Sequence, residues 1–294
     1  MCTLLVKETV NYYTHNSSSV YCCLLDATKA FDRINYNKLF NLLIHRNLPS
    51  VVVRLLINLY TTHKLRIMWN GAFSEIIYVK NGVKQGGILS PILFCVYLDN
   101  LILSLVNSGV GCYMGHICLS VLAYADDVVI LAPTASAMRK LLAICDGFAN
   151  DYDVKFNASK TKCILFQPAC CNKMSCNAKP VFSIQNNNIE FVDSWPHLGH
   201  IINNKLNDCD DIINRRNILL GQINDLLCYF GKLNPVVKTS LLYSYCSNLY
   251  GCELWDLTST QLSAIGLAWR KAMKRVWLLP LGTHAHACYV LALW

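Results

Sequence analysis

The segment VLAYADDVVILA, residues 121–132, restricts what this chain can fold into more than any other. Its apolar flanks favour two buried strands, while Asp126 and Asp127 stand side by side between them. Aspartates are common in the tight turns that join two strands into a hairpin, so a plain turn that faces solvent is one interpretation. The other interpretation is that Asp126 and Asp127 form part of a charged site, which requires a third carboxylate close by in the fold.

Asp26 is the candidate for that third carboxylate. It lies near the end of the apolar run VYCCLLDA, residues 20–27, which predicts a buried strand. Taken alone, an aspartate here is typical of a strand end or a helix cap. If the strand and the hairpin are neighbours in one sheet, the three carboxylates converge and raise one another's pKa values. Hard divalent cations relieve that repulsion, and two of them form the clamp used in nucleotidyl transfer.

Hydrophobic periodicity along the rest of the chain predicts both helices and strands. The expected helices run from about residue 35 to 45, from Pro49 to Tyr60, onward from Pro91, and from about 135 to 151. The expected strands and hairpins lie at Asn70–Gly71, at 163–166 and at 186–188. After about residue 203 strand signals fade, and helical periodicity with many basic residues takes over. We therefore predict an α+β fold with one domain boundary near residue 203.

The composition is compatible with a large packed core and with a nucleic-acid partner. The chain has 294 residues, of which 54% are hydrophobic, and a formal net charge of +8. A basic surface suits a polyanion, although many basic proteins bind none. The most apolar segment, residues 88–106, contains Pro91, Asp99 and Asn100, which favours a buried amphipathic helix over a membrane span.

Sixteen cysteines are scattered along the chain, many of them within apolar runs. Lys7 and Glu8 interrupt the only early apolar run, so no secretory signal is visible. We therefore expect a reduced, intracellular protein with neither a membrane nor a disulfide partner. Cys170, Cys171 and Cys176 are close enough in sequence to suggest a zinc site, but no second ligand pair follows at finger-like spacing.

Seven motifs occur in a specific order along the chain. They are LLDATKAFD at 24–32, GVKQGGILSP at 82–91, YADD at 124–127, FNASKTKCILF at 156–166, HLG at 197–199, NLYGCELW at 248–255 and AWRKAMKRVWLLPLGTH at 268–284. The ordered set resembles the reverse transcriptases of non-LTR (LINE-type) retrotransposons, and it covers nearly the whole chain. The resemblance implies an antiparallel palm sheet backed by helices, with part of the fingers, over residues 1–203. A helical thumb and the start of a following region would occupy residues 204–294.

The resemblance also implies roles for individual residues. Asp26 and Asp126 match the aspartates that bind the two catalytic Mg²⁺ ions in this family, with Mn²⁺ as an alternative. Asp127 lies near the metals in the family, and we count it with the other two as a catalytic and metal-site residue. Phe31 matches the gate that excludes a ribose 2′-hydroxyl, although a ring packed into the core is the plainer interpretation.

Three further motifs match parts of the family that contact the substrates. Gln85 and Gly86 match the loop beside the incoming nucleotide and the template base pair, where a bare turn is the alternative. This chain has Gly87–Ile88 where the family often has Cys-Pro, which is a departure. Lys160 matches a lysine proposed to face the triphosphate, and a solvated lysine is its alternative. The HLG turn, His197, Leu198 and Gly199, resembles the primer grip that steadies the growing 3′ end.

The implied function is RNA-directed DNA synthesis, with an RNA template, a DNA primer and dNTPs as partners. A functional enzyme of this kind would be nuclear or associated with a ribonucleoprotein. In the family a fingers subdomain precedes the first strand, and only 25 residues precede Asp26, so we expect an incomplete fingers region. One alternative is therefore a catalytically inactive nucleic-acid-binding remnant. An RNA-dependent RNA polymerase is a second alternative, against which YADD and the bulky Phe31 argue.

Overall fold

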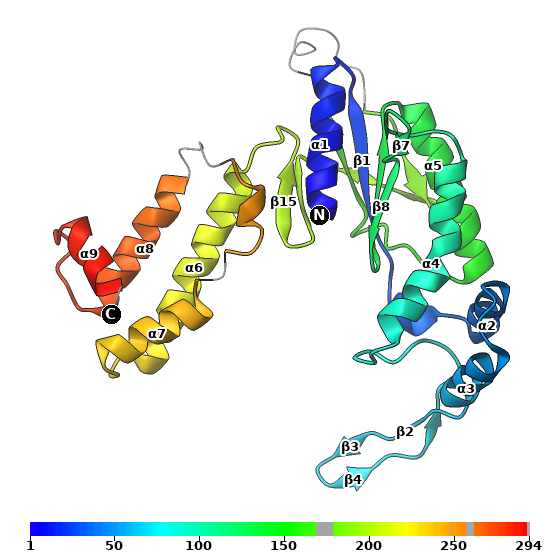
Figure 1. Cartoon of the computed structure of the whole chain (residues 1–294), viewed down its shortest axis with the longest axis horizontal. Coiled ribbons are helices and arrows are strands. Elements are labelled where there is room, and N and C mark those ends of the chain that lie inside the picture. The colour runs from blue at the N-terminus through cyan, green and yellow to red at the C-terminus, as the bar shows by residue number, and fades with distance from the viewer. Residues whose placement is uncertain (169–178, 248, 257–261, 293–294) are drawn as a thin grey trace. The chain divides into compact units, whose positions relative to one another are not determined.

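A computed structural model describes residues 1–168, 179–247, 249–256 and 262–292, and Figure 1 shows it. The chain divides into two compact units, Met1–Asp193 and Ser194–Trp294. The first unit combines a sheet with helices, and the second is mainly helical. The zinc site considered for Cys170, Cys171 and Cys176 lies outside the described residues.

A five-stranded sheet forms the centre of the first unit. Its strand order is β13 (Glu190–Phe191), β10 (Lys162–Phe166), β1 (Val20–Asp26), β9 (Asp127–Ala132) and β8 (Val121–Tyr124). All neighbouring strands are antiparallel except β10 and β13, which are parallel. Strand β1 lies in the middle and is buried along most of its length, as expected for a continuous apolar run with strands on both sides.

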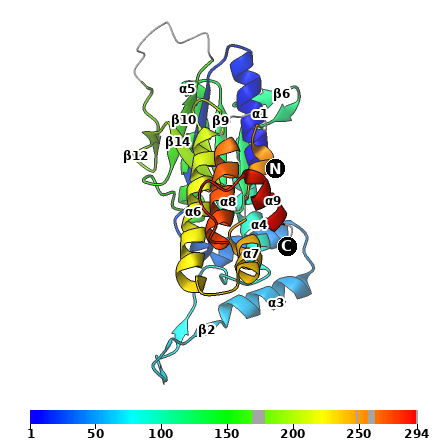
Figure 2. The same cartoon turned by 90° about the vertical axis from the view of Figure 1, so that its left-hand side faces the viewer.

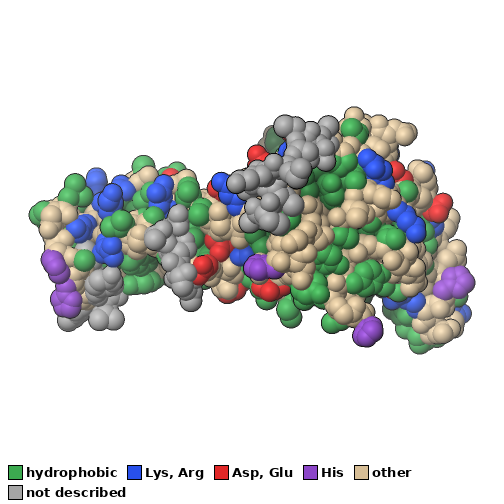
Figure 3. Space-filling model, turned by 90° about the horizontal axis from the view of Figure 1, so that it is seen from above, with side chains coloured by type: hydrophobic (Ala, Val, Ile, Leu, Met, Phe, Trp, Pro, Cys, Tyr) green, Lys and Arg blue, Asp and Glu red, His purple; other side chains and the backbone are tan. Residues whose placement is uncertain are grey.

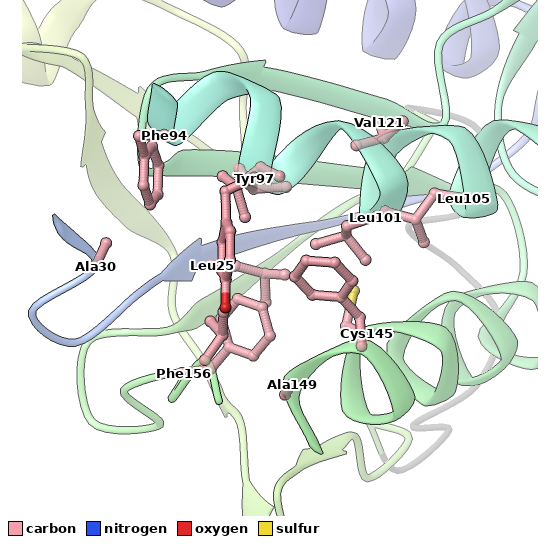
Figure 4. Close-up of a cluster of buried hydrophobic side chains, with 14 of the residues drawn as sticks. Leu25, Ala30, Phe94, Tyr97, Leu101, Leu105, Val121, Cys145, Ala149 and Phe156 are labelled. Atoms are coloured by element: carbon pink, nitrogen blue, oxygen red, sulfur yellow. The ribbon is translucent and has the colours of Figure 1, made fainter. Parts of the chain in front are cut away.

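Helices supply the rest of the first unit's core. They are α1 (Cys2–His15), the 3₁₀ turn η1 (Phe31–Arg33), α2 (Tyr36–His45), α3 (Ser50–Thr61), α4 (Ser90–Asn107) and α5 (Ala135–Tyr152). Figure 4 shows Tyr97 and Leu101 of α4 and Cys145 of α5 gathered around Leu25 of β1. All four side chains are buried in one apolar cluster, so α4 and α5 hold the strand that ends at Asp26.

The predicted helices occur close to their predicted bounds. The Asn35 side chain accepts hydrogen bonds from the backbone N–H groups of Asn37 and Lys38 and so caps α2. Helix α4 is long and apolar enough to cross a membrane by length and composition. Its residues Leu93, Phe94 and others pack in the core of the first unit. Helix α1 is a feature that the sequence patterns did not predict.

A β-hairpin extends from the first unit between α3 and α4 (Figures 1 and 2). We call residues 63–80 the arm. Its strands are β2 (Lys64–Leu65), β3 (Met68–Trp69), β4 (Ala72–Phe73) and β5 (Ile77–Tyr78), with β2 paired to β5 and β3 to β4. The arm turns at Asn70 and Gly71, whose φ angles of 48° and 79° fit the expected tight hairpin.

Two smaller hairpins complete the first unit. They consist of β6 (Tyr113–Met114) with β7 (Ile117–Cys118), and of β11 (Ser183–Ile184) with β12 (Asn187–Asn188). The second was predicted to turn at residues 186–188. It turns instead at Gln185 and Asn186, which both have positive φ. The Gln185 side chain fixes that turn, because it accepts from the N–H of Phe156 and donates to the carbonyl of Val154.

The second unit begins with a hairpin and continues as helices. Its elements are β14 (Ser194–His197), β15 (His200–Asn203), α6 (Cys209–Phe230), α7 (Pro235–Tyr245), the 3₁₀ turn η3 (Cys252–Leu254), α8 (Leu262–Val276) and α9 (Ala285–Ala292). Leu219 and Ile223 of α6, Leu242 of α7 and Met273 of α8 form its main apolar core. The structural division after Asp193 places the β14–β15 hairpin with these helices, whereas the boundary expected from sequence follows the hairpin.

Candidate active site

Strand register brings the predicted acids of the first unit to one end of the sheet. Asp26, the last residue of β1, is paired directly with Asp127, the first residue of β9. Residues opposite each other on antiparallel strands have side chains on the same face, with Cβ atoms about 5 Å apart. Ala125 and Asp126 form the two-residue turn between Tyr124 and Asp127, so Asp126 lies directly beside this pair.

The acids repel one another across this small patch. Partial burial raises the pKa of Asp127, and the charges of Asp126 and Asp26 raise it further. Ala125 has a left-handed φ of 52°, a conformation that costs a non-glycine residue about 1 kcal/mol. Carboxylate oxygens are the ligands that Mg²⁺ prefers, and Mg²⁺ completes its shell with water and phosphate oxygens. Within the described ranges, no three acidic, histidine or cysteine side chains are close enough to hold a metal by themselves.

The NASKTK segment, residues 157–162, holds the backbone of Asp26 in place. The N–H of Asn157 donates to the Asp26 carbonyl at 2.8 Å, and the hydroxyl of buried Thr161 accepts from the Asp26 N–H at 3.3 Å. The Asn157 side chain in turn accepts from the N–H groups of Ser159 and Lys160, closing a tight turn. The Lys160 side chain is exposed. Sequence reasoning singled out Lys160 and missed Asn157 and Thr161 within the same motif.

Phe31 lies at the start of η1, half-buried, and its ring stacks on that of Phe94 with 4.8 Å between centroids. The loop that precedes α4 is tied to this turn. Val83 N–H donates to the Phe31 carbonyl, and Gly82 N–H donates to the Ile34 carbonyl, each at 2.8 Å. Gly82 has a φ of 84°, and a Cβ there would lie 2.8 Å from the Asp32 backbone. Only glycine allows these two loops to approach so closely, a requirement that the sequence did not signal.

Gln85 and Gly86 are the central residues of a turn in which Gly87 N–H donates to the Lys84 carbonyl at 2.9 Å. Gly86 has a φ of 79°, as the third position of a type II turn requires. The Ser90 hydroxyl also donates to the Lys84 carbonyl, so the turn is fixed to the first residue of α4. Gln85 and Gly86 are both exposed, which leaves the outer side of this turn accessible.

In the second unit, the predicted HLG residues form the β14–β15 turn. Leu198 and Gly199 have φ angles of 47° and 77°. Arg215 of α6 donates to the Gly199 carbonyl, and its guanidinium lies 5.6 Å from the centre of the Tyr250 ring. A Cβ on Gly199 would lie 3.0 Å from that ring, so the turn fits closely against Tyr250. Burial and the nearby His200 lower the pKa of His197 to about 4.

A buried polar cluster attaches the same hairpin to α6. His200 Nδ1 lies 3.1 Å from Asp211 Oδ2, and Trp255 Nε1 donates to that oxygen at 2.7 Å. The other oxygen of Asp211 accepts from the Ile201 N–H at 3.0 Å. Burial alone would raise the pKa of Asp211, but these bonds from His200, Ile201 and Trp255 hold it below its usual value. Sequence reasoning missed this cluster, because its members are far apart in the chain.

Basic side chains are numerous on the second unit, as the blue atoms in Figure 3 show. Four of them are Arg216, Lys232, Lys271 and Lys274. Lys232 and Lys271 are exposed, and Lys274 donates to the carbonyl of Leu281 at 2.6 Å. A surface with this charge suits a phosphate backbone.

The chain is similar to known proteins in both sequence and fold. The family model described as "Reverse transcriptase (RNA-dependent DNA polymerase)" matches residues 3–202. The "Retrovirus-related Pol polyprotein from type-2 retrotransposable element R2DM" of Drosophila melanogaster is 32% identical over 184 residues, which are 62% of this chain and 17% of that protein. The "RNA-directed DNA polymerase from mobile element jockey" of Drosophila funebris is 23% identical over 190 residues, 63% of this chain and 20% of that protein. The chain spans about a fifth of the length of these relatives.

The fold resembles that of telomerase. Telomerase from Candida Tropicalis in complex with a TWJ fragment of telomeric RNA has a TM-score of 0.53 and 11% identity, covering 93% of this chain and 42% of that chain. The apo form has a TM-score of 0.51 and 13% identity, covering 98% and 46%. At such identities the likeness concerns the fold, and it confirms the predicted α+β class. Since the family model matches more than half of the sequence and the relatives come from R2 and jockey elements, the chain belongs to the reverse transcriptase (RNA-dependent DNA polymerase) family, in its non-LTR retrotransposon branch.

Proposed function

We propose that this chain catalyses RNA-directed DNA synthesis, in which a primer 3′-hydroxyl attacks the α-phosphate of a dNTP. The observation that carries the proposal is the direct pairing of Asp26 with Asp127 beside the turn that holds Asp126. The family generally depends on divalent metals. Asp26, Asp126 and Asp127 form an acidic patch in which the pKa of Asp127 is raised. Bound divalent cations would relieve the repulsion among these carboxylates.

Asp26 and Asp126 would hold two Mg²⁺ ions, or Mn²⁺ in their place, together with phosphate oxygens of the substrate. The bound ions would neutralise charge on the attacking and leaving oxygens. Asp127 would add to the negative potential that keeps the cations in place. The backbone bonds from Asn157 and Thr161 to Asp26 support this role, because they fix the strand end that carries the ligand.

The residues around the acids would select and orient the nucleotide. Phe31, half-buried and braced by Phe94, would block a ribose 2′-hydroxyl. The exposed turn at Gln85 and Gly86 would contact the base pair that forms on the template. Exposed Lys160 would face the triphosphate and stabilise the departing pyrophosphate.

The second unit would hold the primer–template duplex. His197, Leu198 and Gly199 would steady the primer 3′ end as a primer grip, and the basic helices would bind the phosphate backbone as a thumb. In terms of domains, residues 1–203 would form the palm with part of the fingers, and residues 204–294 the thumb and the start of a following region. The telomerase with a similar fold is bound to an RNA fragment, which supports RNA as a partner of this chain. Association with a ribonucleoprotein follows from that partner.

Primer extension tests the proposal. The full chain is incubated with a DNA primer on matched RNA and DNA templates, with dNTPs or rNTPs and with or without Mg²⁺. We expect Mg²⁺-dependent incorporation of dNTPs on the RNA template, lost in Asp126→Asn. Incorporation of rNTPs alone would make the chain an RNA polymerase, and duplex binding without any incorporation would indicate a non-catalytic binding protein.

A further inference from the structure

The second unit has an open pocket of about 450 Å³ where the end of α6, the first turn of α7 and the end of α8 meet. This volume is in the range of small-molecule sites. Three leucines line the pocket together with the three cations Lys238, Lys274 and Arg275, and we call it the cation pocket. The roles proposed above for the second unit concern its outer surface and not this pocket.

Lys238 of α7 is the most unusual residue of the cation pocket. It is only 2% exposed, and a lysine is rarely buried so fully unless it is paired with an acid. Its ammonium donates one hydrogen bond, to the Gly231 carbonyl at 3.3 Å. Among the described residues, no carboxylate forms a salt bridge with Lys238. A buried charge without a counter-ion is costly, so a bound anion would stabilise it.

Lys274 and Arg275 of α8 add two cations that no acid neutralises within the described part of the chain. Lys274 Nζ donates to the Leu281 carbonyl, and Arg275 donates to the amide oxygen of Asn224, each at 2.6 Å. Cations near the end of a helix often bind oxygens in this way. Each of these bonds uses one N–H, whereas an ammonium has three donors and a guanidinium five. The polar side chains of the cation pocket are therefore all donors with spare N–H groups.

The rest of the cation pocket is apolar. Leu227, Leu278 and Leu279 line it. Leu278 has a left-handed φ of 53° and is 82% exposed, so the pocket offers apolar surface that the protein itself leaves uncovered. A ligand that matches both parts of the lining has an anionic group with several acceptor oxygens, attached to an apolar body.

We propose that the cation pocket binds a phosphate monoester. The phosphate would accept hydrogen bonds from Lys238, Lys274 and Arg275, and its carbon body would lie against the leucines. A phosphate monoester carries nearly two negative charges at neutral pH and three acceptor oxygens, which suits three cations better than a carboxylate does. The internal phosphates of a duplex meet cations on an exposed surface, whereas the buried Lys238 is accessible to a group that enters the pocket. The site therefore goes beyond the polymerase function and does not depend on it.

The test is isothermal titration calorimetry of phenyl phosphate into the full chain, in a buffer without inorganic phosphate. Mg²⁺, primer and dNTP are omitted, so a chain that fails to polymerise still reports on this site. We expect phenyl phosphate to bind more tightly than inorganic phosphate, because its ring can contact the leucines, and phenol not to bind. Failure of phenyl phosphate to bind would overturn the proposal.

Variants of the lining assign the binding to the cation pocket. Lys238→Met and Arg275→Gln should each weaken binding of phenyl phosphate about tenfold, the loss expected for one charge-assisted hydrogen bond. Arg275 is exposed, so its variant keeps the test decisive if Lys238→Met fails to fold. Lys205→Gln removes an exposed lysine of the second unit outside the pocket and should retain wild-type affinity. Wild-type affinity in the folded pocket variants would place the phosphate elsewhere and reject the site.

Competition identifies the source of the phosphate monoester, which is either a free small molecule or the 5′ end of a nucleic-acid strand. A DNA duplex with 5′-phosphates, or the same duplex with 5′-hydroxyls, is added to the complex with phenyl phosphate. Displacement by the 5′-phosphorylated duplex alone supports the site and assigns it to strand ends. Displacement by neither duplex supports the site and assigns it to a free small molecule. Equal displacement by both would show that internal backbone phosphates occupy the pocket, which would overturn the proposal.

Discussion

Asp127 makes the stability of the first unit depend on pH in an unusual direction for an aspartate. Its pKa is raised by partial burial and by the charges of Asp126 and Asp26. The folded state therefore binds this proton more tightly than the unfolded state does. Stability from this group is fully present below the ordinary aspartate pKa and is lost as the pH rises through the raised pKa. At neutral pH without metal, the acidic patch destabilises the fold.

Asp127→Asn should accordingly raise the melting temperature at pH 7 in metal-free buffer. We expect a rise of about 1–2 °C, because repulsion between partly exposed carboxylates lowers the free energy of unfolding by roughly 0.5 kcal/mol. The rise should disappear at a pH below the ordinary aspartate pKa, where the wild-type carboxyl is protonated. Thermal unfolding measured from pH 3 to 8 tests this, with Asp225→Asn, an exposed aspartate of α6, as the control. A lower melting temperature at pH 7 would contradict the repulsion.

Asp126→Asn should abolish nucleotide incorporation and leave the fold intact. Asp126 lies in a half-buried two-residue turn, and asparagine has nearly the same shape as aspartate, so the change removes a proposed metal ligand without opening a cavity. We expect a fall of about three orders of magnitude in rate, equivalent to ~4 kcal/mol of transition-state stabilisation. Single-turnover primer extension at saturating Mg²⁺ measures it, and circular dichroism checks the fold. A folded variant with near-normal incorporation would remove Asp126 from the metal site.

Phe31→Val should let ribonucleotides compete better with deoxynucleotides. The ring of Phe31 stacks on Phe94 but remains half-exposed, which leaves part of it able to touch a bound sugar. The readout is the ratio of kcat/KM for dNTP over rNTP, which we expect to fall at least tenfold. Phe94→Leu removes the supporting ring and serves as the comparison. If Phe31→Val is active and keeps the wild-type ratio, the ring only packs against Phe94.

At the scale of elements, connections between distant segments position the candidate site. The β14–β15 hairpin is attached to α6 and to the segment after α7 through Asp211, which binds His200, Ile201 and Trp255. The pKa of Asp211 is held below its usual value, the reverse of Asp127. Its contribution to stability is therefore present above the ordinary aspartate pKa and is lost as the pH falls through the lowered pKa.

Asp211→Asn should destabilise the second unit and weaken binding of a primer–template duplex. The buried carboxylate accepts several hydrogen bonds, so we expect a loss of about 1–3 kcal/mol in the free energy of unfolding at pH 7. The loss should shrink at low pH, where the wild-type carboxylate also becomes neutral. Denaturant unfolding at pH 7 and pH 3, together with duplex affinity, measures both effects. An equal loss at the two pH values would assign Asp211 a purely steric role.

Local sequence patterns predicted most of the helices and strands. The features that these patterns missed depend on contacts between segments that are far apart in the chain. Apolar runs and turn residues were enough for β1, for the β8–β9 hairpin and for α2, α4 and α5. They left open whether β1 and the hairpin are neighbours, which depends on strand pairing across about 100 residues of chain. Helix α1 was missed because its stability comes from buried residues such as Val6 and Val10, and not from a strong periodic pattern. Gly82 and Asp211 were missed because their partners lie in other segments.

At the scale of the whole molecule, two units with separate cores share one polyanionic partner in the proposed function. The acids lie in the first unit, and the HLG turn and basic helices lie in the second. The net charge of +8 favours association with nucleic acid in general, whereas discrimination of a duplex requires cations in fixed places. Binding of the duplex should therefore depend strongly on salt, and the dependence should be traceable to residues of the second unit.

We expect the logarithm of the duplex association constant to fall linearly with the logarithm of salt concentration, with a slope of about −0.9 for each phosphate contacted. Changing Lys232 and Lys271 together to Gln should reduce the magnitude of the slope by up to about 2, because both are exposed on the second unit. Arg139→Gln with Lys140→Gln removes the same charge from α5 of the first unit and should leave the slope unchanged. Fluorescence anisotropy over a range of KCl concentrations measures the slopes. Equal reductions in both double variants would mean that net charge, and not a thumb-like surface, holds the duplex.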